Sequence, residues 1–213
     1  MSVPKPEGPW LNPGETLVCF GDSLTASKIG YVNTLKAKLE PQGIKVINAG
    51  LPGDKTPYAL TRLVPEVIDL KPDAVSIFFG NNDCIIGRGE WRDEPVISPL
   101  TFKENLKWII HLCRLLGNIQ KFSINTMTPK MEGKVYHQFG DIRPAYCLAA
   151  REAADEANSR IVPLDTVFAQ HWEKNHQNVS DDGLLYTSDG LHMTEEGYRL
   201  IAEAMLKEWN MEK

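Results

Sequence analysis

Short apolar segments alternate with amphipathic segments of helical length along the whole chain, and this alternation limits the fold more than any other feature. The apolar segments are rich in β-branched or aromatic residues, and most are bounded by Gly, Asn or Pro, as strands are. Strands separated by helices form parallel βαβ units, whose sheet is covered on both faces. The strand-like segments are 16–20, 44–50, 73–80, 121–127 and 160–164.

Near-continuous apolar strands such as VSIFF are typical of a sheet that is buried on both faces. We therefore expect a doubly wound, flavodoxin-like α/β sandwich with a parallel sheet of about five strands. The chain has 213 residues, which favours one domain over 1–213, with residues 1–14 as a polar, proline-rich N-terminal extension. No internal repeat or linker argues for a further division.

The helical segments carry signals for where they begin and break. The last one places Tyr198, Met205 and Trp209 on one side, and Thr194 stands where an N-cap is expected. Pro65 should divide the second helical region into two pieces, because proline cannot continue the hydrogen-bond ladder.

Polar, glycine-marked turns follow the first three strands. With a strand order of 2-1-3-4-5, the topological switch point lies between strands one and three, where ligands bind in open α/β sheets. The segments GDSLTAS and GNNDC leave those two strands, and NAGLPGDKT follows strand two. This topology predicts that Ser23, Gly53 and Asn82 surround one pocket mouth.

A serine nucleophile needs a base within hydrogen-bond reach, held in turn by a third group. Of the five histidines, His192 alone stands in a turn that can fold a nearby carboxylate, Asp189, back onto its ring. The other ring nitrogen could then face Ser23. An attacked ester carbonyl also needs hydrogen-bond donors for its developing charge. The Ser23 and Gly53 N–H groups and the Asn82 amide would supply them.

Four short blocks of the sequence resemble those of the SGNH (GDSL) hydrolase family, in the family's order. They are GDSL at 21–24, the glycine at 53, GNND at 80–83 and DGLH at 189–192. The resemblance implies a three-layer α/β/α fold and hydrolysis of carboxylic esters without a metal or other cofactor. It assigns Ser23 as nucleophile, His192 as base and Asp189 as its partner. Ser23, Gly53 and Asn82 become the oxyanion hole.

Residues beside these blocks could hold the turns or contact substrate. Asp22 and Asp83 should mainly bond loop amides, although substrate contact by Asp22 is the alternative. Two long loops, 84–100 and 128–141, leave the carboxyl ends of strands and could form pocket walls. Within the first, Trp91 either faces substrate or packs over its own loop.

Few lid segments are available, so a short acyl group is expected, with acetyl the leading choice. GYVNTLKAKL and the stretch from INAGLPGDKT through LKPDAVSIFFGNND are similar to sugar-ester deacetylases of the family. The substrate would then be a small-molecule or carbohydrate ester. A lysophospholipase or thioesterase activity stays open. A metal-dependent phosphoesterase and a flavin-binding module are more distant alternatives.

The net charge of −5 argues against nucleic acid or an anionic membrane as the main partner. The four cysteines are scattered singly, so neither a zinc site nor a disulfide framework is indicated. No signal peptide or membrane span is visible, and a cytoplasmic location is expected. The sequence leaves self-association into a homo-oligomer open.

Overall fold

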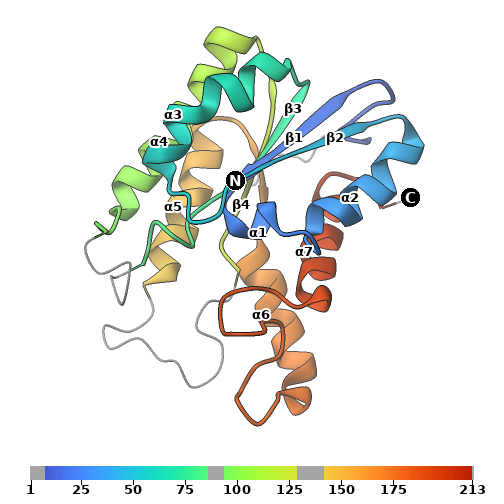
Figure 1. Ribbon diagram of the computed structural model, residues 1–213, viewed down its shortest axis with the longest axis vertical. Coiled ribbons are helices and arrows are strands. Elements are labelled where there is room, and N and C mark those ends of the chain that lie inside the picture. The colour runs from blue at the N-terminus through green and yellow to red at the C-terminus, as the bar shows by residue number, and fades with distance from the viewer. Residues whose placement is uncertain (1–7, 86–93, 129–141, 213) are drawn as a thin grey trace.

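A computed structural model of the protein describes residues 8–85, 94–128 and 142–212 (Figure 1). The strands of this part form one parallel sheet in the order β2-β1-β3-β4-β5, and the expected strand order is confirmed. These strands are β1 (Thr16–Gly21), β2 (Lys45–Gly50), β3 (Ala74–Phe78), β4 (Lys121–Asn125) and β5 (Arg160–Val162).

Side chains of the interior strand β1 alternate between two apolar cores, one on each face of the sheet. Leu17 and Cys19 belong to one core, whereas Val18 and Phe20 belong to the other. All four are fully buried. A strand covered on both sides in this way has no polar face, which explains why its sequence reads as a continuous apolar run.

Helices cover both faces of the sheet and complete the three-layer α/β/α fold (Figure 1). Helices α2, α6 and α7 supply the core on one face, and α3, α4 and α5 supply the core on the other. The bounds are α1 (Ser23–Ala26), α2 (Tyr31–Leu39), α3 (Thr56–Glu66), α4 (Pro99–Gly117), α5 (Arg143–Glu156), α6 (Leu164–Asn175) and α7 (Glu195–Glu208), with 3₁₀ turns at η1 (Glu40–Gln42), η2 (Ile68–Leu70) and η4 (His176–Asn178).

The predicted N-cap of the last helix is confirmed, and the predicted break in the second helical region lies one residue later than expected. Thr194 caps α7 by accepting a hydrogen bond from the Gly197 N–H at 3.2 Å. The second helical region does divide, but the break follows Glu66 rather than Pro65, which lies in the last turn of α3. The fixed φ of proline suits a helix, and near the helix end its missing N–H costs a single bond.

The N-terminal extension, described from Gly8 onward, packs against the end of α7. The Trp10 ring lies 4.9 Å from that of Trp209, and the Trp10 N–H donates to the Trp209 carbonyl at 2.9 Å. The Trp209 indole N–H in turn donates to the Ser123 hydroxyl of β4 at 2.9 Å. Trp10 and Leu11 of this segment therefore belong to the same apolar core as α2, α6 and α7.

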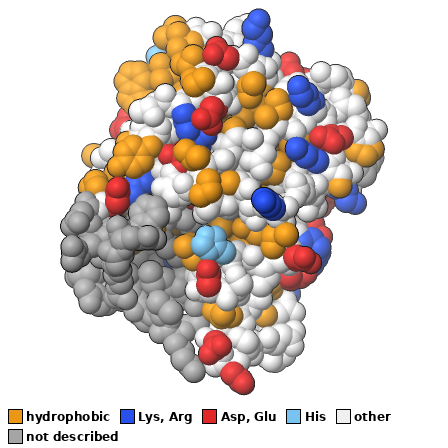
Figure 2. Space-filling model, in the orientation of Figure 1, with side chains coloured by type: hydrophobic (Ala, Val, Ile, Leu, Met, Phe, Trp, Pro, Cys, Tyr) orange, Lys and Arg blue, Asp and Glu red, His pale blue; other side chains and the backbone are white. Residues whose placement is uncertain are grey.

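Figure 2 shows apolar side chains gathered over the part of the surface where α3 and α4 lie in Figure 1. In the described part of the chain, no helix is long and apolar enough to cross a bilayer. The exposed apolar side chains of α3 and α4 are Tyr58, Val64, Leu100, Trp108, Leu115 and Leu116.

Candidate active site

Ser23 stands at the first position of α1, directly after β1. Asp22 caps this short helix, and its Oδ1 accepts a hydrogen bond from the Leu24 N–H at 2.9 Å. The first N–H groups of a helix have no acceptor within it, so the Ser23 N–H is available to a ligand. The Ser23 side chain is half-buried at this turn.

Two glycines allow α1 to lie directly against the ends of β1 and β2. A Cβ on Gly50 would overlap the Ala26 nitrogen and lie 2.7 Å from the Thr25 carbonyl carbon. A Cβ on Gly21 would overlap the Thr25 hydroxyl. The Asn48 side-chain amide also donates to the Thr25 carbonyl at 2.7 Å, which fixes α1 against β2. The position of Ser23 is therefore set by backbone-to-backbone packing.

Gly53 and Asn82 come from two different turns that are joined by a hydrogen bond. Gly53 has φ 77°, a left-handed conformation that favours glycine. The Asn82 Nδ2 donates to the Asp54 carbonyl at 2.9 Å and lies 3.5 Å from the Asp22 Oδ2. One amide hydrogen is thereby committed to Asp54, which fixes the orientation of the Asn82 side chain.

Asp83 provides a second connection between the same two turns. Its Oδ1 accepts hydrogen bonds from the Thr56 N–H at 3.0 Å and from the Thr56 hydroxyl at 2.5 Å, at the beginning of α3. Burial raises the pKa of the Asp83 carboxyl, and the hydrogen bonds from Thr56 oppose that shift. Asp22, Asp54, Thr56, Asn82 and Asp83, all buried, are called the polar cluster below.

His192 and Asp189 lie together on residues 186–194, which are called the histidine loop below. The Nδ1 of His192 is 2.7 Å from the Asp189 Oδ2. The Asp189 Oδ1 accepts from the backbone N–H of Leu191 at 2.9 Å and of His192 at 2.7 Å. Because a carboxylate can only accept here, Nδ1 carries the proton of the neutral imidazole, and Nε2 is left as an acceptor.

The ends of the histidine loop are fixed, although its functional side chains are exposed. Thr187 and Met193 form an antiparallel bridge, and Gly190 supplies the turn between them with φ 88°. About half of the Asp189 and His192 side chains is exposed. Burial acts to raise the pKa of Asp189, but the hydrogen bonds from His192 and Leu191 outweigh it and hold that pKa below its ordinary value.

Tyr198 of α7 lies close enough to Asp189 of the histidine loop and to Asp22 before Ser23 for both charges to affect its pKa. Burial raises the pKa of its phenol, a hydrogen bond from Ser27 opposes the shift, and the charges of Asp22 and Asp189 raise the pKa further. Both carboxylates therefore lie within electrostatic range of one side chain. Figure 1 likewise shows α1 and the loop that enters α7 at the same end of the sheet.

The described end of the 84–100 loop is attached to the polar cluster. The Lys55 side chain is fully buried, and its ammonium group donates to the Pro95 carbonyl at 2.9 Å and to Glu94 at 3.3 Å. The Ile97 N–H donates to the Asp83 carbonyl at 3.0 Å. Trp91 and most of the 128–141 loop lie outside the described residues, so their expected roles stay predictions.

Sequence reasoning missed the buried cations near the site. Arg62 is buried and pairs with Asp54, and Lys55 is buried beside the Asn82 turn. Spacing alone gave one signal, since Arg62 lies one helical turn from the buried Ala59 on α3. An isolated charge on an amphipathic helix is usually solvated, so this spacing was too weak a signal to predict that Arg62 is buried.

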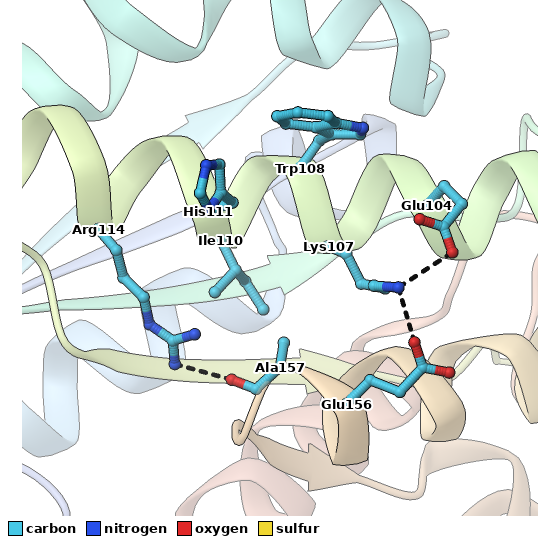
Figure 3. Close-up of a pocket in the computed structure, with 8 residues that line it drawn as sticks. All are labelled: Glu104, Lys107, Trp108, Ile110, His111, Arg114, Glu156 and Ala157. Carbon is cyan, nitrogen blue, oxygen red and sulfur yellow. Dashed lines mark hydrogen bonds and ion pairs between the residues drawn. The ribbon is translucent and has the colours of Figure 1, made fainter.

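A groove of about 350 Å³ lies elsewhere, between α4 and α5 (Figure 3). None of the predicted site residues lines it. Its charged groups are engaged, since Lys107 pairs with Glu104 and Glu156, and Arg114 donates to the Ala157 carbonyl at 2.7 Å. Among the residues that the structure describes, no three His, Cys, Asp or Glu side chains cluster as a metal site would require.

The structure is a three-layer α/β/α sandwich with a serine at the β1 turn and an aspartate–histidine pair before the last helix. Residues 19–200 match the family described as GDSL-like Lipase/Acylhydrolase, and the chain belongs to it. It is therefore a carboxylic ester hydrolase of the SGNH type, and the resemblance seen in the sequence is confirmed.

The similar proteins include two that match over most of their length. A Bacillus subtilis (strain 168) protein named uncharacterized lipoprotein YqeF is 31% identical over 222 residues, which cover 90% of this chain and 88% of the relative. An acetylxylan esterase from Geobacillus stearothermophilus is 25% identical over 230 residues, which cover 95% of this chain and 97% of the relative.

Solved structures confirm the fold. An α/β hydrolase enzyme named LAE5, from the metagenome of Lake Arreo in Spain, superimposes with a TM-score of 0.81 at 20% identity. The match covers 97% of this chain and all of that one. The acetyl xylan esterase AlAXEase has a TM-score of 0.78 at 24% identity over 90% of this chain and 98% of that chain.

Proposed function

We propose that the chain hydrolyses short-chain carboxylic esters, above all acetyl esters, with Ser23, His192 and Asp189 as the catalytic triad. The observation that carries this proposal is the Asp189–His192 pair, whose 2.7 Å contact leaves the imidazole Nε2 as a proton acceptor. The arrangement of the elements also supports this proposal, because α1, which begins with Ser23, and the loop that enters α7 lie at the same end of the sheet (Figure 1).

The reaction has two steps that share one base. The Ser23 Oγ attacks the acyl carbon while the Nε2 of His192 takes the hydroxyl proton, and the carbonyl electron pair moves onto oxygen. Collapse of this intermediate breaks the ester C–O bond, and the departing alcohol takes the proton from His192. Water then attacks the acyl-enzyme, gives its proton to His192, and releases the acid as Ser23 regains its hydrogen.

The developing oxyanion would bind to the N–H groups of Ser23 and Gly53 and to the second amide hydrogen of Asn82, which would exchange its long 3.5 Å contact with the Asp22 Oδ2 for the substrate oxygen. Such donors contribute roughly 10²- to 10³-fold each to the rate. The hydrogen bond from Asn82 to Asp54 supports this role, because it aligns the amide before substrate arrives. Asp22 is buried at the cap of α1 and would hold the turn that carries Ser23. Direct contact of Asp22 with the substrate is the alternative.

An acetylated carbohydrate is the substrate class we favour. Its support is the acetylxylan esterase among the relatives and the sequence similarity to sugar-ester deacetylases. Trp91 would contribute to substrate binding from the 84–100 loop. The cytoplasmic location stays a prediction, because the Bacillus subtilis relative is named a lipoprotein.

The test compares p-nitrophenyl acetate hydrolysis by wild type and by Ser23→Ala, each with and without a chelator. We expect a loss of roughly 10³-fold or more in the variant and no effect of the chelator. Equal activity of the two proteins would contradict serine catalysis.

A second assay compares acetylated xylooligosaccharides with octanoyl esters, lysophospholipids and acyl thioesters. Rapid release of acetate from the sugars would support the substrate class. Efficient cleavage of octanoyl or longer esters, together with untouched acetylated sugars, would overturn it in favour of a lipid- or thioester-directed enzyme.

A further inference from the structure

Arg62 of α3 is a buried arginine whose whole guanidinium group is engaged. Its Nε donates to the Asp54 Oδ2 at 2.7 Å, and Nη2 contacts the same oxygen at 2.6 Å. Nη2 also donates to the Gly21 carbonyl at 2.9 Å, and Nη1 donates to the Ala49 carbonyl at 3.0 Å and to Glu66 at 2.6 Å. These contacts match in number the five N–H groups that a guanidinium carries.

The acceptors of Arg62 are the parts of the backbone that carry the candidate site. Gly21 is the last residue of β1, two positions before Ser23, and Ala49 lies near the end of β2. Asp54 follows Gly53, whose N–H is a proposed oxyanion donor. The guanidinium carbon also lies 4.4 Å from the centre of the Phe20 ring, so stacking fixes its plane against β1.

The contact with Asp54 reaches the other oxyanion donor as well. The backbone carbonyl of Asp54 accepts the hydrogen bond from the Asn82 amide. The side-chain Oδ1 of Asp54 accepts a hydrogen bond from the Lys55 N–H at 3.0 Å. A displacement of Asp54 would therefore move both the Gly53 N–H and the Asn82 side chain relative to Ser23. Misplacement of reacting groups by about 1 Å can cost roughly 10²-fold in rate.

We propose that Arg62 is a positioning residue that holds the Gly53 and Asn82 oxyanion donors in register with the Ser23 turn. This inference rests on the proposed function of those residues. Lysine cannot replace Arg62, because a single ammonium nitrogen cannot contact Asp54, Gly21 and Ala49 in one plane. The fork geometry, rather than the positive charge alone, is the property that the site uses.

The two acidic partners of Arg62 offer a matched pair of variants. Asp54 is buried and adjoins the oxyanion donors, whereas Glu66 is 45% exposed and lies one helical turn further along α3. Asp54→Asn and Glu66→Gln each replace one carboxylate on the same guanidinium by an amide of similar shape. If Arg62 is merely structural, the two variants should have a similar kcat per folded molecule. If Arg62 is a positioning residue, kcat should fall in Asp54→Asn alone.

Arg62→Lys is compared with Arg114→Lys. Arg114 also donates to a backbone carbonyl, that of Ala157, and its guanidinium lies 5.2 Å from the Phe122 ring centre (Figure 3). It lies between α4 and α5, away from the strand ends that carry the site. The comparison of Arg62→Lys with Arg114→Lys therefore separates the general effect of losing a stacked arginine from the effect of losing Arg62.

The experiment measures kcat and KM for p-nitrophenyl acetate in all four variants, divided by the amount of serine that a fluorophosphonate titrates at its end point. Misfolded protein is thereby removed from the comparison. We expect kcat per titrated serine to fall about 10-fold or more in Asp54→Asn and roughly 10²-fold in Arg62→Lys, with KM changed less than about 3-fold. Glu66→Gln and Arg114→Lys should stay within about 2-fold of wild type.

Equal values in Asp54→Asn and Glu66→Gln, or in Arg62→Lys and Arg114→Lys, would overturn the positioning role. Ser23→Ala separates this result from a failure of the proposed function. Hydrolysis that survives in Ser23→Ala contradicts the triad itself. An inactive Ser23→Ala combined with matching losses in the paired variants contradicts the role of Arg62 alone.

Discussion

The polar cluster is buried and held by contacts between distant parts of the chain, whereas Asp189 and His192 of the histidine loop are half exposed and contact each other within one turn. Asn82 reaches Asp54 across 28 positions of the sequence and Asp22 across 60. Asp189 and His192 are only three positions apart. The oxyanion half of the proposed site is thus part of the core structure, and the base half is a local motif placed beside it.

This difference predicts separate consequences of mutation in the two regions. Changes in the polar cluster should lower both stability and activity, because its side chains also connect strands and helices. Changes in the histidine loop should lower activity with little effect on stability, since exposed side chains contribute little to the free energy of unfolding.

Replacing His192 with alanine should give the largest loss of activity at the smallest cost in stability. We expect kcat to fall about 10⁴-fold, because the nucleophile loses its base. The melting temperature should change by less than about 2 °C, as for an exposed residue. Esterase assays and thermal unfolding of the same samples measure both. Unfolding of the variant at a much lower temperature would show that the loop is not an independent unit.

Asp189→Asn should lower kcat by roughly 10²- to 10⁴-fold, again with little change in melting temperature. An amide can donate to Nδ1, which favours the wrong imidazole tautomer and leaves Nε2 unable to accept a proton. Asp181→Asn, on the exposed segment just before the loop, serves as the control and should behave as wild type. Equal kcat values for the two variants would remove Asp189 from the proposed triad.

Gly50→Ala should damage both properties, as expected for the buried side of the contrast. The added Cβ overlaps the backbone of α1 at Ala26, so the helix that carries Ser23 must shift. We expect a loss of about 1–3 kcal/mol in unfolding free energy and about 10-fold in kcat. In the control Gly117→Ala, the nearest atoms to the Cβ are all side-chain atoms, those of Ile119 from 3.0 Å and of Ile68 at 3.3 Å. A harmless Gly50→Ala would contradict the close seating of α1.

The pH dependence of stability should have opposite signs in the two regions. The raised pKa of Asp83 means that the folded protein binds this proton more tightly than the unfolded chain. Its contribution to stability therefore declines as pH rises through the range just above the ordinary aspartate pKa. The lowered pKa of Asp189 gives a contribution that is present above the ordinary value and is lost as pH falls below it.

Melting temperatures of wild type, Asp83→Asn and Asp189→Asn between about pH 3 and pH 7 measure these contributions. The advantage of wild type over Asp83→Asn should grow as pH falls from neutrality, and its advantage over Asp189→Asn should shrink in acid. Shifts of about 1–2 °C are expected, because Asp189 is half exposed and its interactions are screened. Parallel pH profiles would show that the two carboxylates lie in similar surroundings.

The sequence predicted the parts of the molecule that depend on local pattern. Strand positions and the Thr194 cap followed from periodicity and turn residues, and the strand order followed from the flavodoxin-like fold class that these indicate. The Asp189–His192 pair followed from a three-residue spacing across a glycine. The arrangement of turns at the strand ends followed from topology, which does not need side-chain detail.

The contacts that join the turns could not be predicted in the same way. Arg62 reaches Gly21 across 41 positions and Lys55 reaches Pro95 across 40, and neither distance leaves a periodic signal. Both residues are charged, so sequence patterns place them in solvent, yet both are buried by the tertiary structure. Such networks become visible only when the strands are assembled.

Labelling with a fluorophosphonate tests most directly whether Ser23 is an activated nucleophile. The reagent modifies a serine rapidly when a base and an oxyanion hole activate it, and much more slowly when they do not. We predict one adduct per chain in wild type, located on the peptide that contains Ser23, and none in Ser23→Ala or in His192→Ala over the same time. An unlabelled wild type, an adduct at another residue, or full labelling of His192→Ala would contradict the account.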